Sequence, residues 1–379
     1  MTQPRLLLIG PVPPPMHGVT AYVRMLLDDP ALRERWEVLH LDTSDHRSLA
    51  NLGRFDLTNV RLALSHVAEL ALRLRRERVQ AVWIPVSSNA AAYLRDALFI
   101  LAAHAAGARV VTHLHGGGFG EFYQGASAPV RWLVRASSAR IDRAWVLGNR
   151  LQAMYDGLVP RTRLRVVPNG VPDPMVERAA PAVGDRPCTL LHLGSLSVAK
   201  GVLELLEAAR RIVASGSDLR VILAGGWLNG HDERLIRAAL GSRELRDRVE
   251  LPGVVTGSGK SEVLERADVF VLATRWPYEG QPLAILEAMA ASLPVVATPR
   301  AAIPDSVQDG VTGILVPEGD TDALTAGLAR LAADAGLRAR MGAGGRALWA
   351  REFTAARAMS RVVEAFEEVR GAARDPVAA

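Results

Sequence analysis

The chain alternates short apolar runs with longer segments of helical periodicity. In the first half the apolar runs are RLLLIG, AVWIPV, RVVTHLHG, RAWVLG and LRVVPNG, and each is followed by a helical or loop segment. Short apolar runs between helical segments are typical of strands buried on both faces of a parallel sheet. The pattern therefore predicts an α/β domain in which helices cover both sides of the sheet.

A second series of the same kind follows a proline-rich break. Residues 172–187, PDPMVERAAPAVGDRP, show no periodicity and read as a linker. After it come TLLHLG, LRVILAGG, RVELPG, DVFVLAT, LPVVAT and TGILVP. We therefore expect two doubly wound, Rossmann-like domains that face each other across a cleft. The expected bounds are 1–175 and 188–350, with a helix near 353–370 that packs back on the first domain.

Length and cysteine content agree with this division and restrict the class of protein. A chain of 379 residues exceeds the usual size of one core. The single cysteine, Cys188, excludes an intrachain disulfide, and no Cys/His cluster is spaced to hold zinc. The apolar start LLLIG is too short for a signal peptide, and no stretch approaches the ~18 apolar residues of a membrane span. We expect a soluble, cytoplasmic protein.

The charge is unevenly distributed. The chain carries a net charge of +5 and has a pI near 9.8. Residues 1–175 contribute +7 and the remainder −2, and only two of the 45 cationic residues are lysines, Lys200 and Lys260. The basic pI suggests a nucleic-acid binder, but the arginines are scattered among acids with few aromatic residues, which argues against one.

Several loops after the predicted strands carry candidate chemistry, because ligands of open α/β sheets bind at the carboxyl ends of the strands. The first loop ends in Gly18 before a helix, where the backbone could approach a phosphate. The loop THLHGGGFG places His113 and His115 on one face of the chain. No carboxylate or cysteine stands at ligand spacing to them, so a polar or packing role is more plausible than metal binding.

Lys200 stands at a predicted helix start, in LGSLSVAKGV. A cation is disfavoured there by the helix dipole unless it pairs with an anion. An anionic ligand would resolve this conflict, and a solvated lysine without a role is the alternative.

The segment PYEGQPLAILEAMAASLPVVAT, residues 277–298, holds two carboxylates on either side of a predicted helix start. Pro282 can occupy the first helical position, where its missing N–H is not needed, so Glu279 lies in the loop and Glu287 in the helix. The free N–H groups of that first turn attract phosphate. Glu279 is then placed to hold a group attached to the phosphate. A solvated loop acid and a helix-surface acid are the alternative reading.

Taken together and in order, these residues resemble a known family, the retaining GT-B glycosyltransferases of family GT4. The resemblance covers nearly the whole chain. Its most specific part is EGQPLAILEAM, which is similar to the E-x7-E motif of the family, and VVPNGV, KGV, RADVFVLAT and DGVTGILVP also match. The resemblance implies an enzyme that uses a nucleotide-sugar donor and needs no metal ion.

Carried over position by position, the resemblance implies a role for each motif residue. Glu279 would contact the donor sugar, Glu287 the ribose and His115 the sugar from the other domain. Lys200 would neutralise the diphosphate, which Gly18 would approach. The catalytic set is then His115, Lys200 and Glu279. The remaining donor-binding positions are Ser195, Val255, Lys260, Gly280, Gln281, Pro282, Leu283 and Ala284, with Val255 and Lys260 in a loop that borders the base.

The sequence departs from the family pattern at Ser195, where the family often has an arginine. One cation of the expected diphosphate clamp is therefore replaced by a hydroxyl. Guanine offers N–H donors that suit a carboxylate, yet residues 253–261 contain no acid, so UDP is favoured over GDP.

The acceptor is left open between a glycan, a lipid-linked sugar and a small molecule. The first half holds two arginine clusters, one of which surrounds Trp132 in VRWLVRASSARIDRAW. A basic, partly apolar face of this kind would suit peripheral contact with an anionic membrane, with a solvated helix face as the equal alternative. A nucleotide-sugar binding protein with weak or no catalysis is the second function class.

Overall fold

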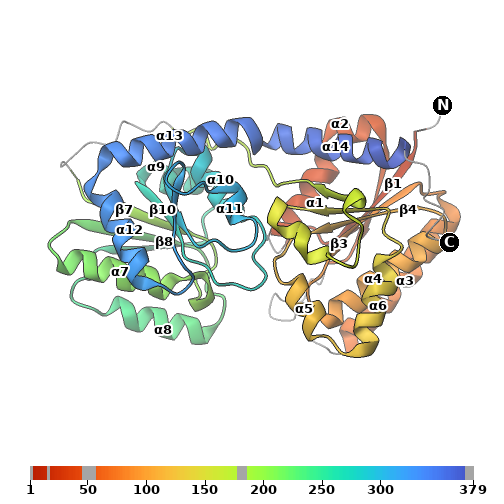
Figure 1. Cartoon of the computed structure of the whole chain (residues 1–379), viewed down its shortest axis with the longest axis horizontal. Helices are drawn as coiled ribbons and strands as arrows, with labels where there is room; N and C mark the ends of the chain where they lie inside the picture. The colour runs from red at the N-terminus through yellow and green to blue at the C-terminus, as the bar shows by residue number, and fades with distance from the viewer. Residues whose placement is uncertain (1–2, 15–17, 45–56, 177–185, 372–379) are drawn as a thin grey trace. The chain divides into compact units, whose positions relative to one another are not determined.

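The computed structural model describes residues 3–14, 18–44, 57–176 and 186–371, and the chain divides into two compact units (Figure 1). The first unit contains Met1–Asn169 and Ala356–Ala379, and the second contains Gly170–Ala355. The chain therefore enters the second unit shortly before residue 175 and returns to the first near its carboxyl end. Much of the expected linker, residues 177–185, lies outside the described residues.

The first unit is built on a six-stranded parallel sheet in the order β2-β1-β3-β4-β5-β6. The strands are β1 (Arg5–Gly10), β2 (Glu37–Asp42), β3 (Ala81–Val86), β4 (Arg109–Leu114), β5 (Arg143–Val146) and β6 (Leu164–Val166). Strand β2 is absent from the predicted strands. It lies at the sheet edge, where only Leu41 of EVLHLD is buried, so its sequence lacks the apolar run of a central strand.

Helices cover both faces of this sheet. They are α1 (Gly18–Asp28), α2 (Pro30–Arg35), α3 (Leu57–Arg76), α4 (Ala90–Ala105), α5 (Phe119–Gly125), α6 (Ala128–Ser138) and α14 (Ala355–Gly371), with 3-10 helices η2 (Asn149–Tyr155) and η3 (Arg161–Arg163). Alternate strand residues such as Leu6, Trp83 and Trp145 pack against α1, α2 and α14. On the other face α4 lies between α3 and α6 (Figure 1).

The second unit has a six-stranded parallel sheet in the order β12-β11-β10-β7-β8-β9. The strands are β7 (Cys188–Leu193), β8 (Leu219–Ala224), β9 (Val249–Gly253), β10 (Val269–Leu272), β11 (Val295–Ala297) and β12 (Gly313–Leu315). Each of them coincides with a predicted run. Strand β10 pairs with β7, so the loops that follow these two strands leave the same edge of the sheet side by side.

Helices cover both faces of the second sheet as well. They are the 3-10 helix η4 (Val198–Lys200), α7 (Val202–Ala214), α8 (Gly230–Leu240), α9 (Gly257–Arg266), α10 (Leu283–Ala290), α11 (Ile303–Ser306), α12 (Thr321–Ala333) and α13 (Ala335–Glu352). Phe270 and Leu272 belong to one core with α9 and α10, whereas Val269 and Val271 belong to the other with α7 and α12. The alternation of the strand side chains thus explains why both faces are apolar. In the described part of the chain, no helix is long and apolar enough to cross a membrane.

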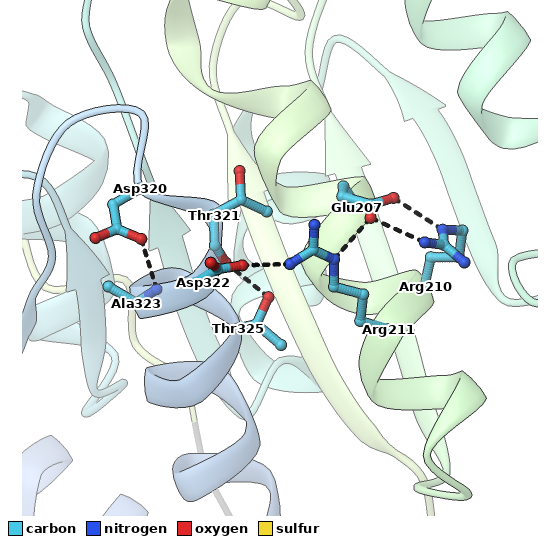
Figure 2. Close-up of polar contacts among 8 residues, drawn as sticks. All are labelled: Glu207, Arg210, Arg211, Asp320, Thr321, Asp322, Ala323 and Thr325. Carbon is cyan, nitrogen blue, oxygen red and sulfur yellow. Dashed lines mark hydrogen bonds and ion pairs between the residues drawn. The ribbon is translucent and has the colours of Figure 1, made fainter.

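Polar contacts tie α7 to α12 on the surface of the second unit (Figure 2). Arg211 donates to Glu207 at 2.7 Å and to Asp322 at 2.5 Å, and Arg210 also donates to Glu207. Hydrogen bonds from the two guanidinium groups lower the pKa of Glu207 to about 2. Asp320 caps α12 by accepting from the Ala323 N–H at 2.8 Å. These contacts hold α7 and α12 together, and neither of these two helices carries a predicted site residue.

Gly201 brings the loop after β7 against the loop after β10. Its φ of 79° lies in the left-handed region, and a Cβ atom there would stand 2.2 Å from the Ala273 carbonyl oxygen. Gly216, after α7, also has a positive φ of 94°, but nothing lies within 4 Å of its Cβ position. Of these two positions, only Gly201 therefore requires a glycine for both its backbone conformation and the lack of space for a Cβ atom.

We predict that Gly201→Ala destabilises the second unit far more than Gly216→Ala does. The left-handed conformation costs about 1–2 kcal/mol in both variants, whereas the clash with backbone adds a further penalty of about 2 kcal/mol or more only at Gly201. Urea unfolding of both variants would measure the difference. Equal losses in the two variants would contradict the close approach of the loops.

Candidate functional site

The loop after β7 holds Lys200 in a fixed position. Ser197 caps the 3-10 turn, because its hydroxyl accepts from the Lys200 N–H at 3.2 Å. Gly201 then turns the chain into α7. Ser195 lies exposed in the same loop, next to the site that the resemblance assigns to a diphosphate.

Lys200 and Glu279 form a partly buried ion pair. Lys200 Nζ lies 2.6 Å from Glu279 Oε2, and the side chains are only 20% and 8% exposed. The same carboxylate oxygen accepts from the Thr274 hydroxyl at 2.9 Å. The pair joins the loop after β7 to the loop after β10, and it gives a cation to a buried carboxylate that Thr274 alone would leave without a counter-charge.

Lys260 and Glu287 form a second ion pair in the same unit. Lys260 Nζ lies 2.7 Å from Glu287 Oε1, with side chains 35% and 17% exposed. Lys260 belongs to α9, so its expected place in a loop is wrong: Gly257, with a φ of 51°, begins the helix three residues earlier. The half-buried Val255, before α9, packs against the core of the unit.

The two lysines of the chain therefore pair with the two glutamates of the E-x7-E motif. All other cations in the sequence are arginines, and they form the surface ion pairs of the fold. Lysine presents a compact point charge, whereas arginine presents a planar fork that suits bidentate contacts. The two exceptional cations thus stand beside the two motif acids.

The amino-terminal end of α10 lies between these acids. Pro282 is the N-cap in an extended conformation, with φ −63° and ψ 121°, so its expected place at the first helical position is wrong by one residue. Leu283 and Ala284 open the first turn, whose N–H groups have no partner inside a helix. The buried Gln281 side chain donates to the Ser306 hydroxyl at 3.0 Å, and Gln281 follows the buried Gly280.

In the first unit, His115 follows β4 and packs among aromatic rings. Its ring lies 4.7 Å from that of Tyr22 and 4.1 Å from that of His113, measured between centroids. Burial lowers the pKa of His115 to about 3 and that of His113 well below its usual value. Both imidazoles are therefore neutral at physiological pH. Gly18, the first residue of α1, has free space around its Cβ position.

The predicted residues are thus divided between the units. Lys200, Glu279 and Glu287, with the backbone at the start of α10, come together in the second unit, whereas Gly18 and His115 belong to the first. In the described part of the chain, no three His, Cys, Asp or Glu side chains are grouped to hold a metal ion.

Thr274 and Ser306 support the site and were absent from the sequence interpretation. Thr274 binds the Glu279 carboxylate, and Ser306 accepts from Gln281. The sequence could have indicated Thr274, because it directly follows the buried run VFVLA and ligands of open α/β sheets bind at the carboxyl ends of the strands. No local signal marks Ser306, which lies in α11.

Comparisons with known proteins show what the chain is similar to. The family model for Glycosyl transferases group 1 matches residues 187–334. The putative colanic acid biosynthesis glycosyltransferase WcaL of Salmonella typhimurium is 36% identical over 149 residues, which cover 38% of this chain and 36% of that protein. The amylovoran biosynthesis glycosyltransferase AmsK of Erwinia amylovora is 34% identical over 150 residues, with coverage of 38% and 36%. The matched stretch thus spans about a third of the length of these relatives.

A solved structure extends the likeness to the whole fold. Sucrose-phosphate synthase from Thermosynechococcus elongatus superposes with a TM-score of 0.76 at 19% identity and covers 97% of this chain and 100% of that one. At this identity the likeness concerns the fold alone. With the family model and the relatives, it leads to one conclusion: residues 187–334 are a domain of the kind found in the group 1 glycosyl transferases, and the chain as a whole has the GT-B fold.

Proposed function

We propose that the protein is a retaining glycosyltransferase that moves a hexose or N-acetylhexosamine from a nucleoside diphosphate to an acceptor hydroxyl. The observation that carries this proposal is the pairing of the two lysines with the two motif glutamates on either side of the start of α10. Members of family GT4 use nucleotide-sugar donors. A nucleotide sugar presents a ribose, a diphosphate and a hexose in that order, and the site presents a matching row of groups.

Each part of the donor has a partner in this row. The first-turn N–H groups of Leu283 and Ala284 donate to the diphosphate, which Lys200 neutralises. Glu287 binds the ribose hydroxyls, because ionised carboxylates accept two hydrogen bonds well. Glu279 binds hydroxyls of the hexose close to the reacting carbon.

The chemistry needs a group that stabilises the departing diphosphate. When the bond between the anomeric carbon and the phosphate oxygen breaks, its electron pair goes to the diphosphate, which gains charge. Lys200 and the α10 N-terminus stabilise that charge, in the place of a metal ion. The acceptor hydroxyl attacks the face that the diphosphate leaves, and its proton passes to a phosphate oxygen. The configuration is thereby retained.

UDP is the proposed nucleotide. Residues 253–261, which border the proposed base site, include the half-buried Val255 and no acid. Guanine would leave its N1–H and N2–H₂ donors without a carboxylate there, whereas uracil makes fewer demands. A GT-B protein that binds the nucleotide sugar with little or no catalysis is the alternative. Hydrolysis of a nucleotide sugar by the pure protein separates the two.

An anionic membrane is the proposed place of the acceptor, at the cytoplasmic face. Helices α3, α4 and α6 expose large apolar side chains on one face of the first unit: Leu64 is 59% exposed, Leu98 42% and Trp132 69%. Because α4 contacts both α3 and α6, the three exposed side chains belong to neighbouring helices (Figure 1). Such a face would bury its apolar side chains in the lipid headgroup region.

Charge on the three helices fits the same partner. The same helices carry exposed arginines, namely Arg75 and Arg76 on α3 and Arg131, which precedes Trp132, on α6. The only acids in these helices are Glu69, which pairs with Arg73, and the buried Asp96. Each basic residue near an anionic surface contributes about 1 kcal/mol. A lipid-linked acceptor is therefore favoured over a free glycan or a small molecule.

Glu279→Gln should lower turnover by about 10² or more while the fold is kept. The amide retains hydrogen bonds but loses the charge beside the developing cationic sugar and the partner of Lys200. Turnover is measured with whichever UDP- or GDP-sugar the wild type hydrolyses fastest. Glu207→Gln, which also removes an ion-paired carboxylate, is the control and should stay within threefold. Turnover of Glu279→Gln within threefold of wild type would remove Glu279 from the site.

Lys200→Ala should reduce kcat/KM by about 10² to 10³, because a charge-assisted contact in a dry site contributes roughly 2–4 kcal/mol. Ser195 is exposed beside it, so Ser195→Arg has room for a second cation. We expect Ser195→Arg to strengthen UDP binding in the wild type and to restore part of the loss in Lys200→Ala. Calorimetry with UDP and GDP on the four proteins of this cycle measures the coupling. Unchanged diphosphate affinity in Lys200→Ala would show that the clamp is misplaced.

Flotation with liposomes tests the membrane face. Binding should appear with phosphatidylglycerol, fade with added salt and weaken in Trp132→Ala and in Arg131→Glu, because apolar insertion and charge act together. Leu235→Ala is the matched control, since Leu235 is 40% exposed on α8 of the other unit. Equal binding to neutral vesicles, or none to either kind, would leave a solvated helix face.

A further inference from the structure

The loop that carries Glu279 exposes an aromatic ring. Among the aromatic residues that the structure describes, only Trp132 and Tyr278 are exposed, and Tyr278 directly precedes Glu279. Tyr278 is 48% exposed, and its ring packs edge to face on that of the half-buried Trp276, with centroids 5.6 Å apart and planes at 71°. An exposed ring and a half-buried ring thus lie together directly before the carboxylate of the proposed sugar site.

Hydrogen bonds hold the backbone of Trp276 in a fixed position relative to Glu279. The Trp276 N–H donates to the Thr274 hydroxyl at 3.1 Å, and this hydroxyl in turn donates to the Glu279 carboxylate. The Trp276 carbonyl accepts from Arg300 Nε at 2.7 Å and from the Glu279 N–H at 3.1 Å. The rings and the carboxylate therefore belong to one hydrogen-bonded loop, and a ligand of Glu279 meets the rings in a fixed position.

The polar groups of the two rings are free to bind a ligand, and the arginines near them are paired with acids. Within the described residues, neither the Tyr278 hydroxyl nor the Trp276 indole N–H has a hydrogen-bond partner. Arg275 is paired with Glu204, and Arg300 is paired with Glu318 at 2.9 Å. The loop thus offers apolar ring faces, two hydrogen-bonding groups and little net charge.

We propose that Trp276 and Tyr278 form a stacking surface for a pyranose ring bound next to Glu279, an inference that rests on the proposed function of this site. A pyranose ring has an apolar face of C–H groups and a rim of hydroxyls, so it matches rings that carry a polar tip. A phosphate would find no unpaired cation in this loop. The ring is either the hexose of the donor or the sugar of the acceptor that receives it.

Binding of free sugars tests the surface without any turnover. In nitrogen–proton NMR spectra, the Trp276 indole signal is assigned by its loss in Trp276→Phe. Titration with methyl α-D-glucopyranoside, methyl α-D-galactopyranoside and methyl α-D-mannopyranoside should shift this signal with at least one of the three. The shift should disappear in Tyr278→Ala and persist in Tyr278→Phe, which keeps the ring. The Trp132 signal, from the other exposed aromatic residue, is the internal control and should not move.

Calorimetry then distinguishes the two sources of the ring. UDP is compared with UDP-glucose, UDP-galactose and UDP-N-acetylglucosamine in wild type and in Tyr278→Ala. A loss of about fivefold to tenfold in the affinity for the nucleotide sugar, with UDP affinity unchanged, assigns the surface to the donor hexose. Unchanged affinity for both, with loss of the pyranoside shift, assigns it to the acceptor.

Two results would overturn the proposal. One is the absence of a Trp276 shift with all three pyranosides, and the other is an equal shift in Tyr278→Ala or at Trp132. Failure of the proposed function has a different signature, namely no hydrolysis of any UDP- or GDP-sugar while the Trp276 signal still responds to a pyranoside. The experiments therefore distinguish failure of the proposed stacking surface from failure of the proposed glycosyltransferase activity.

Discussion

The ion pair between Lys200 and Glu279 is the contact on which the candidate site depends. It joins residues 79 positions apart, and it exists because β10 pairs with β7, so that their loops leave one edge of the sheet together. Gly201 allows the two loops to touch, since a side chain there would collide with the Ala273 carbonyl. Lys260 and Glu287 repeat the arrangement between α9 and α10, which pack in one core. The pairing of β10 with β7 therefore brings Lys200 and Glu279 together.

This arrangement has a consequence for donor binding. Each motif carboxylate has a cation as its partner, so neither acid is left unpaired in a partly buried position. On the proposed function, a diphosphate shares or takes over Lys200, and a sugar hydroxyl replaces the lysine at Glu279. The strength of this proposed binding then depends on how many cations the loop after β7 supplies, and Ser195 in place of an arginine leaves that task to Lys200.

The two units contain different physical environments. The first unit surrounds His115 with Tyr22, Trp83 and His113, and burial keeps both imidazoles neutral, so the carboxyl end of β4 carries polar rings without charge. The second unit supplies the charged groups and the first-turn N–H groups of α10. Its loop also exposes Tyr278, which adds an apolar surface beside the acid.

The sequence by itself determined the class of fold and the residues of the motif, because apolar periodicity and the E-x7-E spacing are local properties of the chain. It missed β2, whose single buried residue gives no apolar run, and it misplaced Lys260 and Pro282, because helix ends depend on caps and turns that periodicity does not report. Only the tertiary structure decided that each lysine pairs with a motif glutamate and that the Thr274 hydroxyl donates to Glu279. Such pairings follow from which strands are neighbours, and strand order is a long-range property that local patterns do not encode.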